Sequence, residues 1–244
     1  MSLLIQFFIL LFLFPSLGMT HSVIDSKVEK LLARHIEASG GENALLTMQS
    51  ISRYGQITFF RESYPKESYC YHTDIVYPGK LREQIKGRQI EYDRGTDGTS
   101  YWLWTGNQYE FTDNKALIDY MKNTAERANR DLLWVRKESG KFTLPPSTPS
   151  WAPENSECIQ AREGKPKRAY CFDSSTGLLN AIGSQEEYRL QSDWRTVGNL
   201  KIPFHLVHYQ NGAMVYELQL DHAKLNDVIL EIQFHKPVFP HLDC

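Results

Sequence analysis

Side chains that could do chemistry are scattered along this 244-residue chain and form no catalytic motif. The sequence has no G-x-S-x-G nucleophile elbow, no H-E-x-x-H zinc motif, no P-loop and no G-x-G-x-x-G dinucleotide loop. His205 and His208 are three residues apart in a predicted strand, so they point to opposite faces and cannot readily share a metal ion. Asp97 and Asp173 lie beside glycine or serine, where turn hydrogen bonds account for them. We therefore predict no catalytic residue, no metal, no cofactor and no enzymatic activity.

An apolar run, Leu3–Leu13, begins the chain and is broken at Pro15. Its length of about eleven residues suits the core of a signal peptide and falls short of the roughly 20 residues that span a bilayer. We expect a signal peptide over residues 1–20, cleavage near residues 18–22, and one domain over residues 21–244. Because no Lys or Arg precedes the run, a permanent membrane anchor is the alternative. The product is expected to be soluble and periplasmic or secreted.

Four cysteines, Cys70, Cys158, Cys171 and Cys244, follow the expected leader. An even number of cysteines in an exported chain, without a C-x-x-C pair, favours disulfides over metal binding. Cys158 and Cys171 lie symmetrically about residues 164–165, so a hairpin with an even-length loop places them opposite each other. A loop of odd length would shift this register. We predict a Cys158–Cys171 disulfide and, by elimination, a second between Cys70 and Cys244.

Three late segments alternate between apolar and polar residues, over residues 200–206, 214–220 and 228–234. This period predicts antiparallel strands with one buried face, and Asn211-Gly212 predicts a hairpin turn between the first two. Aromatic residues over 101–111 indicate either a core or the wall of an apolar cavity. A one-residue bulge would decide whether Tyr101 and Leu103 or the two tryptophans point inward. The candidate inward residues, which would contact a ligand, are Ile57, Phe59, Trp102, Trp104, Met214, Tyr216, Leu218, Ile232 and Phe234.

Helices are predicted at two places along the chain. Residues 23–39 carry apolar side chains at helical spacing and end at a Gly-Gly pair, and a short second helix follows over Glu42–Met48. Strands begin at Ser50, and residues 114–134 form an amphipathic helix that interrupts them and would cover part of a cavity. The proline-rich stretch 144–153 cannot be a central strand, and we interpret it as a long connection within one domain.

The composition is that of an ordinary globular protein. Hydrophobic residues make up 41%, and 27 Lys+Arg against 29 Asp+Glu give a formal net charge of −2. This balance provides no basic surface for nucleic acid, and the apolar content excludes wholesale disorder.

Several short motifs occur in an order that is similar to a known family. They are Ala38-Ser39-Gly40-Gly41, the strand from Ile51 to Phe60, Tyr77-Pro78-Gly79-Lys80-Leu81-Arg82, Thr96-Asp97-Gly98-Thr99-Ser100-Tyr101-Trp102, Tyr170-Cys171-Phe172-Asp173 with Thr176-Gly177-Leu178-Leu179, Ser192-Asp193-Trp194-Arg195, Val197-Gly198-Asn199-Leu200-Lys201-Ile202-Pro203 and Phe234-His235-Lys236-Pro237. Over nearly the whole mature chain, this order resembles the LolA/LolB-like superfamily of bacterial envelope proteins. The resemblance implies an α+β fold, a half-open, strongly curved antiparallel β-barrel whose mouth is covered by helices. No cysteine follows the apolar run directly, so the lipid-tethered form of the family is not expected.

The resemblance implies a protein that binds or carries a hydrophobic ligand, such as a lipid, an acyl chain or an acylated envelope lipoprotein, in an apolar cavity. One alternative is an interaction or sensor subunit of an envelope complex that has the same fold and no exchangeable ligand. A further alternative is a secreted hydrolase. A large cavity would indicate the binding protein, and an exposed apolar patch would indicate the interaction subunit. A cluster of an acid, a base and a nucleophile would indicate the hydrolase.

Overall fold

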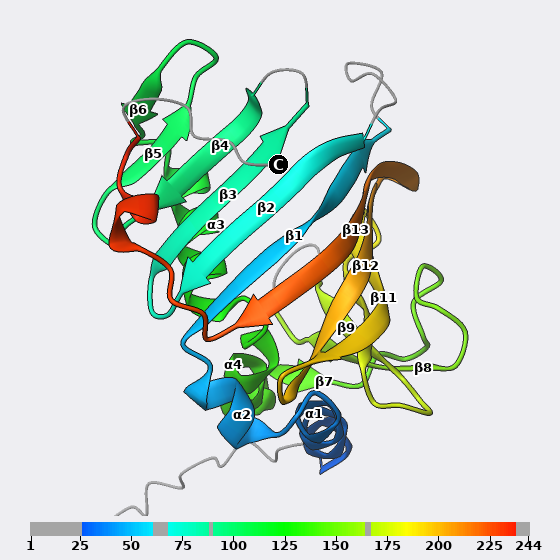
Figure 1. Cartoon of the computed structure of the whole chain (residues 1–244). Coiled ribbons are helices and arrows are strands. Elements are labelled where there is room, and N and C mark those ends of the chain that lie inside the picture. Colours follow the sequence, from blue (N-terminus) through cyan, green and yellow to red (C-terminus); the bar gives the residue numbers. More distant parts are fainter. Residues whose placement is uncertain (1–25, 61–67, 88–89, 164–166, 238–244) are drawn as a thin grey trace, which may run out of the picture.

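The computed structural model describes residues 26–60, 68–87, 90–163 and 167–237. The expected leader, residues 1–20, and its cleavage region lie outside these residues. Within them, four α-helices accompany one sheet of 13 strands (Figure 1). The helices are α1 (Ser26–Ala38), α2 (Glu42–Thr47), α3 (Lys115–Arg127) and α4 (Asp131–Lys137). The strands are β1 (Ser50–Phe59), β2 (Ser68–Val76), β3 (Lys80–Lys86), β4 (Ile90–Thr96), β5 (Tyr101–Trp104), β6 (Tyr109–Phe111), β7 (Phe142–Thr143), β8 (Ser156–Ala161), β9 (Ala169–Asp173), β10 (Leu179–Gly183), β11 (Glu187–Val197), β12 (Leu200–Gln210) and β13 (Ala213–Leu225), with short 3-10 turns η1 (Ser139–Lys141) and η2 (Glu231–Phe234).

The sheet consists of two meanders that meet at its middle. Its strand order is β6-β5-β4-β3-β2-β1-β13-β12-β11-β10-β9-β8-β7, and neighbouring strands pair antiparallel, including β1 with β13. The sheet curls and does not close, so β6 and β7 remain as its edges (Figure 1). This arrangement confirms the expected half-open, curved antiparallel sheet with helices. The strands on the two sides of the proline-rich stretch 144–153 belong to the same sheet, as expected.

The face against which the four helices pack is called the inner face, and the opposite face the outer face. Two apolar clusters fill the inner side. The first joins β1–β3, β12 and β13 to all four helices, with Ile51, Leu81, Met121 and Ala125 fully buried. The second joins α1 and α4 to β7–β10. Because both clusters include helix residues, the helices are part of the core of this fold.

Two of the three predicted late strands are present, and the third prediction is wrong. Residues 200–206 and 214–220 lie in β12 and β13, and the turn between them has Asn211 and Gly212 at φ 51° and 78°, as a type I′ hairpin requires. Residues 228–234 instead form an irregular segment and η2. β13 already pairs with β1 and β12, so no free edge is available beside it. The segment therefore crosses the outer face.

The predicted helix over residues 114–134 is two helices. Asn114 caps α3 by accepting a hydrogen bond from the Leu117 amide, as an N-cap residue does. Asn129 has φ 60°, a left-handed conformation that interrupts the helical backbone between α3 and α4. The apolar period continues through this interruption, which is why the sequence pattern does not reveal it.

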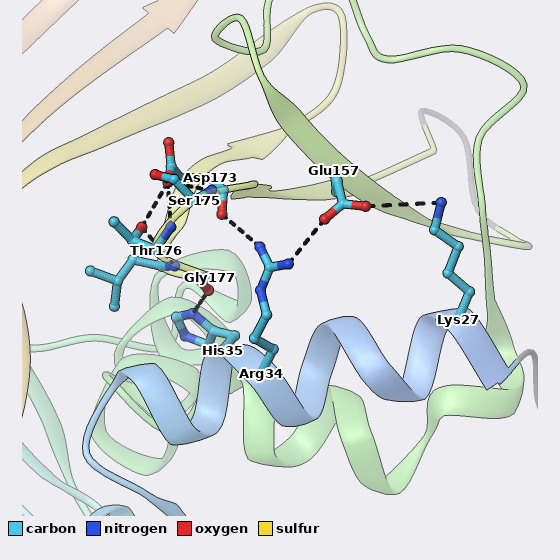
Figure 2. Close-up of polar contacts among 9 residues, drawn as sticks. Lys27, Arg34, His35, Glu157, Asp173, Ser175, Thr176 and Gly177 are labelled. Atoms are coloured by element: carbon cyan, nitrogen blue, oxygen red, sulfur yellow. Dashed lines mark hydrogen bonds and ion pairs between the residues drawn. The ribbon is translucent and has the colours of Figure 1, made fainter.

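Helix α1 is fastened to the turn that follows β9 (Figure 2). The Arg34 guanidinium donates to the Asp173 carbonyl at 2.9 Å and to Glu157 at 3.2 Å. The buried His35 places Nδ1 at 3.1 Å from the Gly177 carbonyl oxygen. A carbonyl oxygen only accepts, so the Nδ1 atom carries the proton, and Nε2 accepts from the Ser39 hydroxyl at 3.1 Å. Both ring nitrogens of the neutral His35 are therefore hydrogen-bonded.

The two aspartates assigned to turns are turn residues, as predicted. The Asp173 carboxylate accepts hydrogen bonds from the hydroxyl and amide groups of Ser175 and Thr176, which lower its pKa to about 2. The Asp97 carboxylate accepts from the amides of Thr99 and Ser100.

The predicted hairpin disulfide is confirmed. Cys158 on β8 lies opposite Cys171 on β9, with their Cα atoms 4.1 Å apart and their sulfurs bonded. Trp151 and Ala152, from the proline-rich connection, pack on this pair at the outer face. Cys70 is also disulfide-bonded. Its expected partner, Cys244, lies outside the described residues.

The double variant Cys158→Ser/Cys171→Ser tests the contribution of this disulfide. The bond closes a short loop, with a sequence separation of 13. We expect the free energy of unfolding to fall by about 3 kcal/mol, because the unfolded chain gains freedom. Urea denaturation of both proteins measures the change. Non-reducing peptide mapping is the independent check, and a Cys158 peptide linked to Cys70 or Cys244 would contradict the structure.

His35 makes stability depend on pH. Burial lowers its pKa from 6.5 to about 4, against the opposing hydrogen bond to Gly177. Between those two pH values the unfolded chain binds a proton that the folded chain does not, so stability falls as the pH falls. We expect a loss of roughly 3 kcal/mol by pH 4. Urea denaturation across this range should show a shallower pH dependence for His35→Gln, whereas the exposed-site variant His235→Gln should retain the wild-type slope.

Candidate functional site

One end of the inner face is lined by large side chains that are only partly buried. Phe59 on β1 lies directly opposite Tyr216 on β13, and their ring centroids are 6.3 Å apart. Leu206 lies on the neighbouring β12 and packs on the same cluster. Tyr120 of α3 completes the group and is 42% exposed. We call these four residues the mouth. They form an apolar surface that is continuous with the buried core.

Helix α3 is held over the inner face near the mouth by one charged cluster. The Arg94 guanidinium lies between the rings of Tyr92 and Tyr120, at 4.1 and 4.0 Å from their centroids. It forms an ion pair with Glu83 at 2.7 Å, and the Tyr120 hydroxyl donates to the same carboxylate at 3.3 Å. Burial, helped by the Glu83 charge, raises the pKa of Tyr120 to about 12, so the hydroxyl remains a donor at neutral pH.

Polar contacts also hold the junction between α3 and α4. The Tyr77 hydroxyl donates to the Ala128 carbonyl. The Arg130 guanidinium stacks over the Tyr77 ring at 3.9 Å and donates to the carbonyls of Leu45, at 2.8 Å, and Met48. By contrast, α3 itself buries only two side chains, Met121 and Ala125. We call α3, residues 115–127, the cover. It is attached to the sheet by a few polar contacts and a small apolar area.

Four of the predicted inward residues lie on the inner face. Ile57 and Leu218 are buried in the first cluster, whereas Phe59 and Tyr216 belong to the mouth. Met214 is half-buried and lies next to a bulge in the pairing of β12 and β13.

The placement of Trp102 and Trp104 is a correction to the sequence interpretation. Leu103 of β5 pairs with Arg94 on the inner face, so the two tryptophans point to the outer face. There the fully buried Trp102 donates from Nε1 to the Phe234 carbonyl at 2.8 Å. The sequence left the choice of face open because strand alternation fixes only which residues share a face.

Ile232 and Phe234 also lie away from the inner face. Phe234 is buried against the outer face, where the C-terminal segment crosses the sheet (Figure 1). Ile232 of η2 is 67% exposed. Both placements follow from the absence of the predicted strand over 228–234.

Beneath the C-terminal segment, the outer face holds a buried ion pair. Arg82 and Asp93 are 3.0 Å apart with almost no exposed surface. The Tyr109 hydroxyl donates to Asp93 at 2.6 Å, and Arg82 donates to Gln233 at 3.1 Å. Because these groups satisfy one another, the cluster attaches the C-terminal segment and offers no reactive group.

Two hollows lie outside the inner face. One, of about 260 Å³, lies between α1 and the proline-rich connection and includes Lys27, Leu31, Pro145 and Glu157 in its lining. The other, of about 390 Å³, lies between the outer face and the C-terminal segment and is lined mainly by polar residues, with Tyr54, His72, Asp74 and Arg82 among them. The first is smaller than the roughly 300–1,000 Å³ of an ordinary ligand pocket, and the second lacks the apolar lining that an acyl chain needs.

His205 and His208 point to opposite faces, as predicted. His208 stacks on Tyr216 at the inner face, with ring centroids 4.9 Å apart. His205 forms a hydrogen-bonded chain with Ser192, at 2.8 Å from Nδ1, and Glu217, at 2.7 Å from Nε2. This chain contains the residue types of a hydrolase site, but it lies across three strands and lines neither hollow. Cross-strand hydrogen bonding accounts for it.

Among the described residues, no helix is both long and apolar enough to cross a membrane.

The sequence matches no known protein-family profile and no curated protein. Solved structures share its fold. A LolA-superfamily protein from Nitrosomonas europaea is 12% identical, with a TM-score of 0.54, over 86% of this chain and 97% of that one. An outer-membrane lipoprotein-sorting protein domain from Vibrio parahaemolyticus and a DUF1329-family protein from Desulfovibrio piger are each 7% identical, with TM-scores of 0.57 and 0.56 over 86% of this chain and 96% of theirs. Identities this low establish the fold alone, and the fold of this chain is that of the LolA superfamily.

Proposed function

We propose that this protein is an exported, periplasmic or secreted, binding protein that carries an amphiphile with its acyl chain on the inner face. The ligand is a lipid or the acyl chain of an envelope lipoprotein, and no chemistry is performed on it. The observation that carries this proposal is the mouth, a partly exposed apolar surface continuous with the core and bordered by a lightly attached cover.

The interior is occupied by side chains, so a ligand must displace part of the cover. The free energy of burying an acyl chain can be compared with the free energy lost when α3 moves. Lifting α3 exposes one methionine and one alanine that are fully buried, which costs about 2–4 kcal/mol of apolar burial. An acyl chain gains about 0.8 kcal/mol for each methylene that it buries. A chain of ordinary lipid length therefore more than offsets the loss of these two buried side chains.

The similar structures support the same proposal. The neighbour from Vibrio parahaemolyticus is described as a lipoprotein-sorting domain, and it shares the open sheet over most of both chains. Such a sheet, with an apolar inner face and separate helices above it, suits the exchange of a hydrophobic ligand, because binding changes the cover and leaves the strand pairing intact.

A second candidate function is that of an interaction subunit in an envelope complex. It is favoured by Val228, Leu230 and Ile232, which are 92%, 62% and 67% exposed on the segment that crosses the outer face. Three apolar side chains at alternate positions of one exposed segment are characteristic of a protein contact. This candidate requires no opening of the cover.

A titration with a fluorescent zwitterionic lysolipid, lysophosphatidylcholine, tests the carrier proposal. We expect binding at micromolar concentration. Phe59→Ala should weaken it roughly tenfold, because it removes most of one aromatic ring from the mouth. Trp104→Ala is the matched control, since this half-buried aromatic residue lies on the outer face, and its affinity should equal that of the wild type.

Native mass spectrometry of protein purified from its own envelope provides the second readout. Co-purified lipid at one molecule per chain would support the carrier. If the wild type neither retains lipid nor binds the probe, the carrier proposal fails and the interaction subunit takes its place.

A further inference from the structure

A row of residues on the inner face leads from the mouth to Arg189, which is hydrogen-bonded to Tyr216 and has no ion-pair partner among the described residues. Cross-strand register places Tyr216, His208, Arg189, Ile182 and Tyr170 side by side on β13, β12, β11, β10 and β9. Neighbouring strands are about 4.8 Å apart, so Arg189 begins about 10 Å from Tyr216. The guanidinium of an arginine can reach across that distance. Arg189 is thus adjacent to the surface proposed to hold the acyl chain.

Two further arginines approach the same row from other elements. The Arg127 guanidinium, at the end of α3, lies 3.8 Å from the centroid of Trp134 on α4. The Arg168 guanidinium lies 5.9 Å from the centroid of Tyr170, at the far end of the row. Within the described ranges, no carboxylate lies within 4.0 Å of Arg127, Arg168 or Arg189.

The three arginines act electrostatically on the same two groups. Burial raises the pKa of Asp131, at the start of α4, and the charges of Arg189, Arg168 and Arg127 act in the opposite direction. Burial likewise raises the pKa of Tyr170, on which the same three arginines also act. Three cations, at the end of α3, just before β9 and on β11, are therefore close enough to influence the same two groups.

The local charge balance leaves an excess of positive charge. Three carboxylates lie near the row: Glu83, which is paired with Arg94; Asp131; and Glu187, which is 3.5 Å from His208 Nε2 at the exposed rim. Two other arginines of the inner side have structural partners, Arg94 in its ion pair with Glu83 and Arg130 in its bonds to backbone carbonyls, whereas the buried Nε and Nη2 atoms of Arg53 on β1 have no hydrogen-bond partner. Arginines without ion-pair partners beside an apolar surface are suited to bind an anion that arrives with the ligand.

We propose that Arg127, Arg168 and Arg189 bind the anionic headgroup, a phosphate or carboxylate, of the amphiphile whose acyl chain lies against Phe59 and Tyr216. The inference rests on the carrier function proposed above and specifies its ligand. The guanidinium group matches these oxyanions because it donates two parallel hydrogen bonds. The apolar mouth then binds the chain, and the arginines select the charge.

Competition between lysolipids of equal acyl length tests this specificity. Lysophosphatidylglycerol and lysophosphatidic acid, both anionic, should displace the fluorescent lysophosphatidylcholine at least fivefold more effectively than unlabelled lysophosphatidylcholine does. The preference should diminish as salt is raised, because ions screen the arginines. Inorganic phosphate should displace the probe only at millimolar concentration, since it lacks the acyl chain.

The lysolipid affinities of arginine variants test whether these side chains bind the headgroup. Arg189→Gln and Arg168→Gln should each reduce the affinity for anionic lysolipid about five- to tenfold and reduce the affinity for the zwitterionic probe less, because choline balances the charge of its phosphate. Arg195→Gln is the matched control on the same strand, because Arg195 is already paired with Asp193 at 2.6 Å. Arg189→Lys should restore part of the preference. Unchanged urea midpoints establish that the variants are folded.

Two results would overturn the inference while the carrier function stands. One is equal affinity of the wild type for anionic and zwitterionic lysolipids. The other is a loss in Arg189→Gln that is the same for both. Inorganic phosphate binding as tightly as anionic lysolipid would also overturn it, since the site would then be one for free oxyanions. Failure of every lysolipid to bind would instead refute the carrier proposal itself.

Discussion

The pairing of β1 with β13 is the interaction on which the rest of the structure depends. It is the only junction between the two meanders within the described sheet, so it creates one inner face from two halves of the chain. The ladder is continuous except for an irregularity at Tyr54/Gly55. At Gly55 a Cβ atom would lie 2.2 Å from the Gln219 carbonyl oxygen, which leaves glycine as the residue that fits. The close approach of the two backbones at this point is therefore built into the sequence.

An open sheet has two faces to cover, and this protein covers them in different ways. On the inner face, helices contribute apolar side chains to both clusters. On the outer face, the chain turns at Asn226, whose side chain accepts a hydrogen bond from the Gln49 amide at 2.7 Å, and then crosses the strands. That crossing is secured by Phe234, Trp102 and the buried ion pair of Arg82 with Asp93. A buried ion pair contributes more to specificity of position than to net stability, which suits a segment that must follow one path.

The two coverings also differ in how easily they can be removed. The C-terminal segment is attached through side chains that are completely enclosed, such as Trp102 and Asp93. The cover over the mouth is attached through tyrosines and arginines, with Tyr120 partly exposed. Polar contacts of this kind exchange readily for contacts with water. The inner face is thus the side on which a ligand can replace protein, and the outer face is the side that keeps the sheet in one shape.

Local patterns in the sequence determined a large part of this structure. The alternation in β12 and β13, the Asn211-Gly212 turn, the position of α1 and the Cys158–Cys171 disulfide all depend on residues near one another in the chain, so their periods and spacings could be read directly. The tertiary structure decided which face each strand turns inward. Trp102 and Phe59 both carry large aromatic side chains, and only the strand register places them on opposite faces. The residues over 228–234 have a strand pattern but find no free edge beside β13, the strand they follow, because β1 and β12 occupy both of its sides. The grouping of the three arginines could not be predicted from the sequence, because it also depends on the tertiary structure. A single arginine in a helix, a loop or a strand has the pattern of a solvated face, and Arg127, Arg168 and Arg189 approach one another only when α3, the start of β9 and β11 meet.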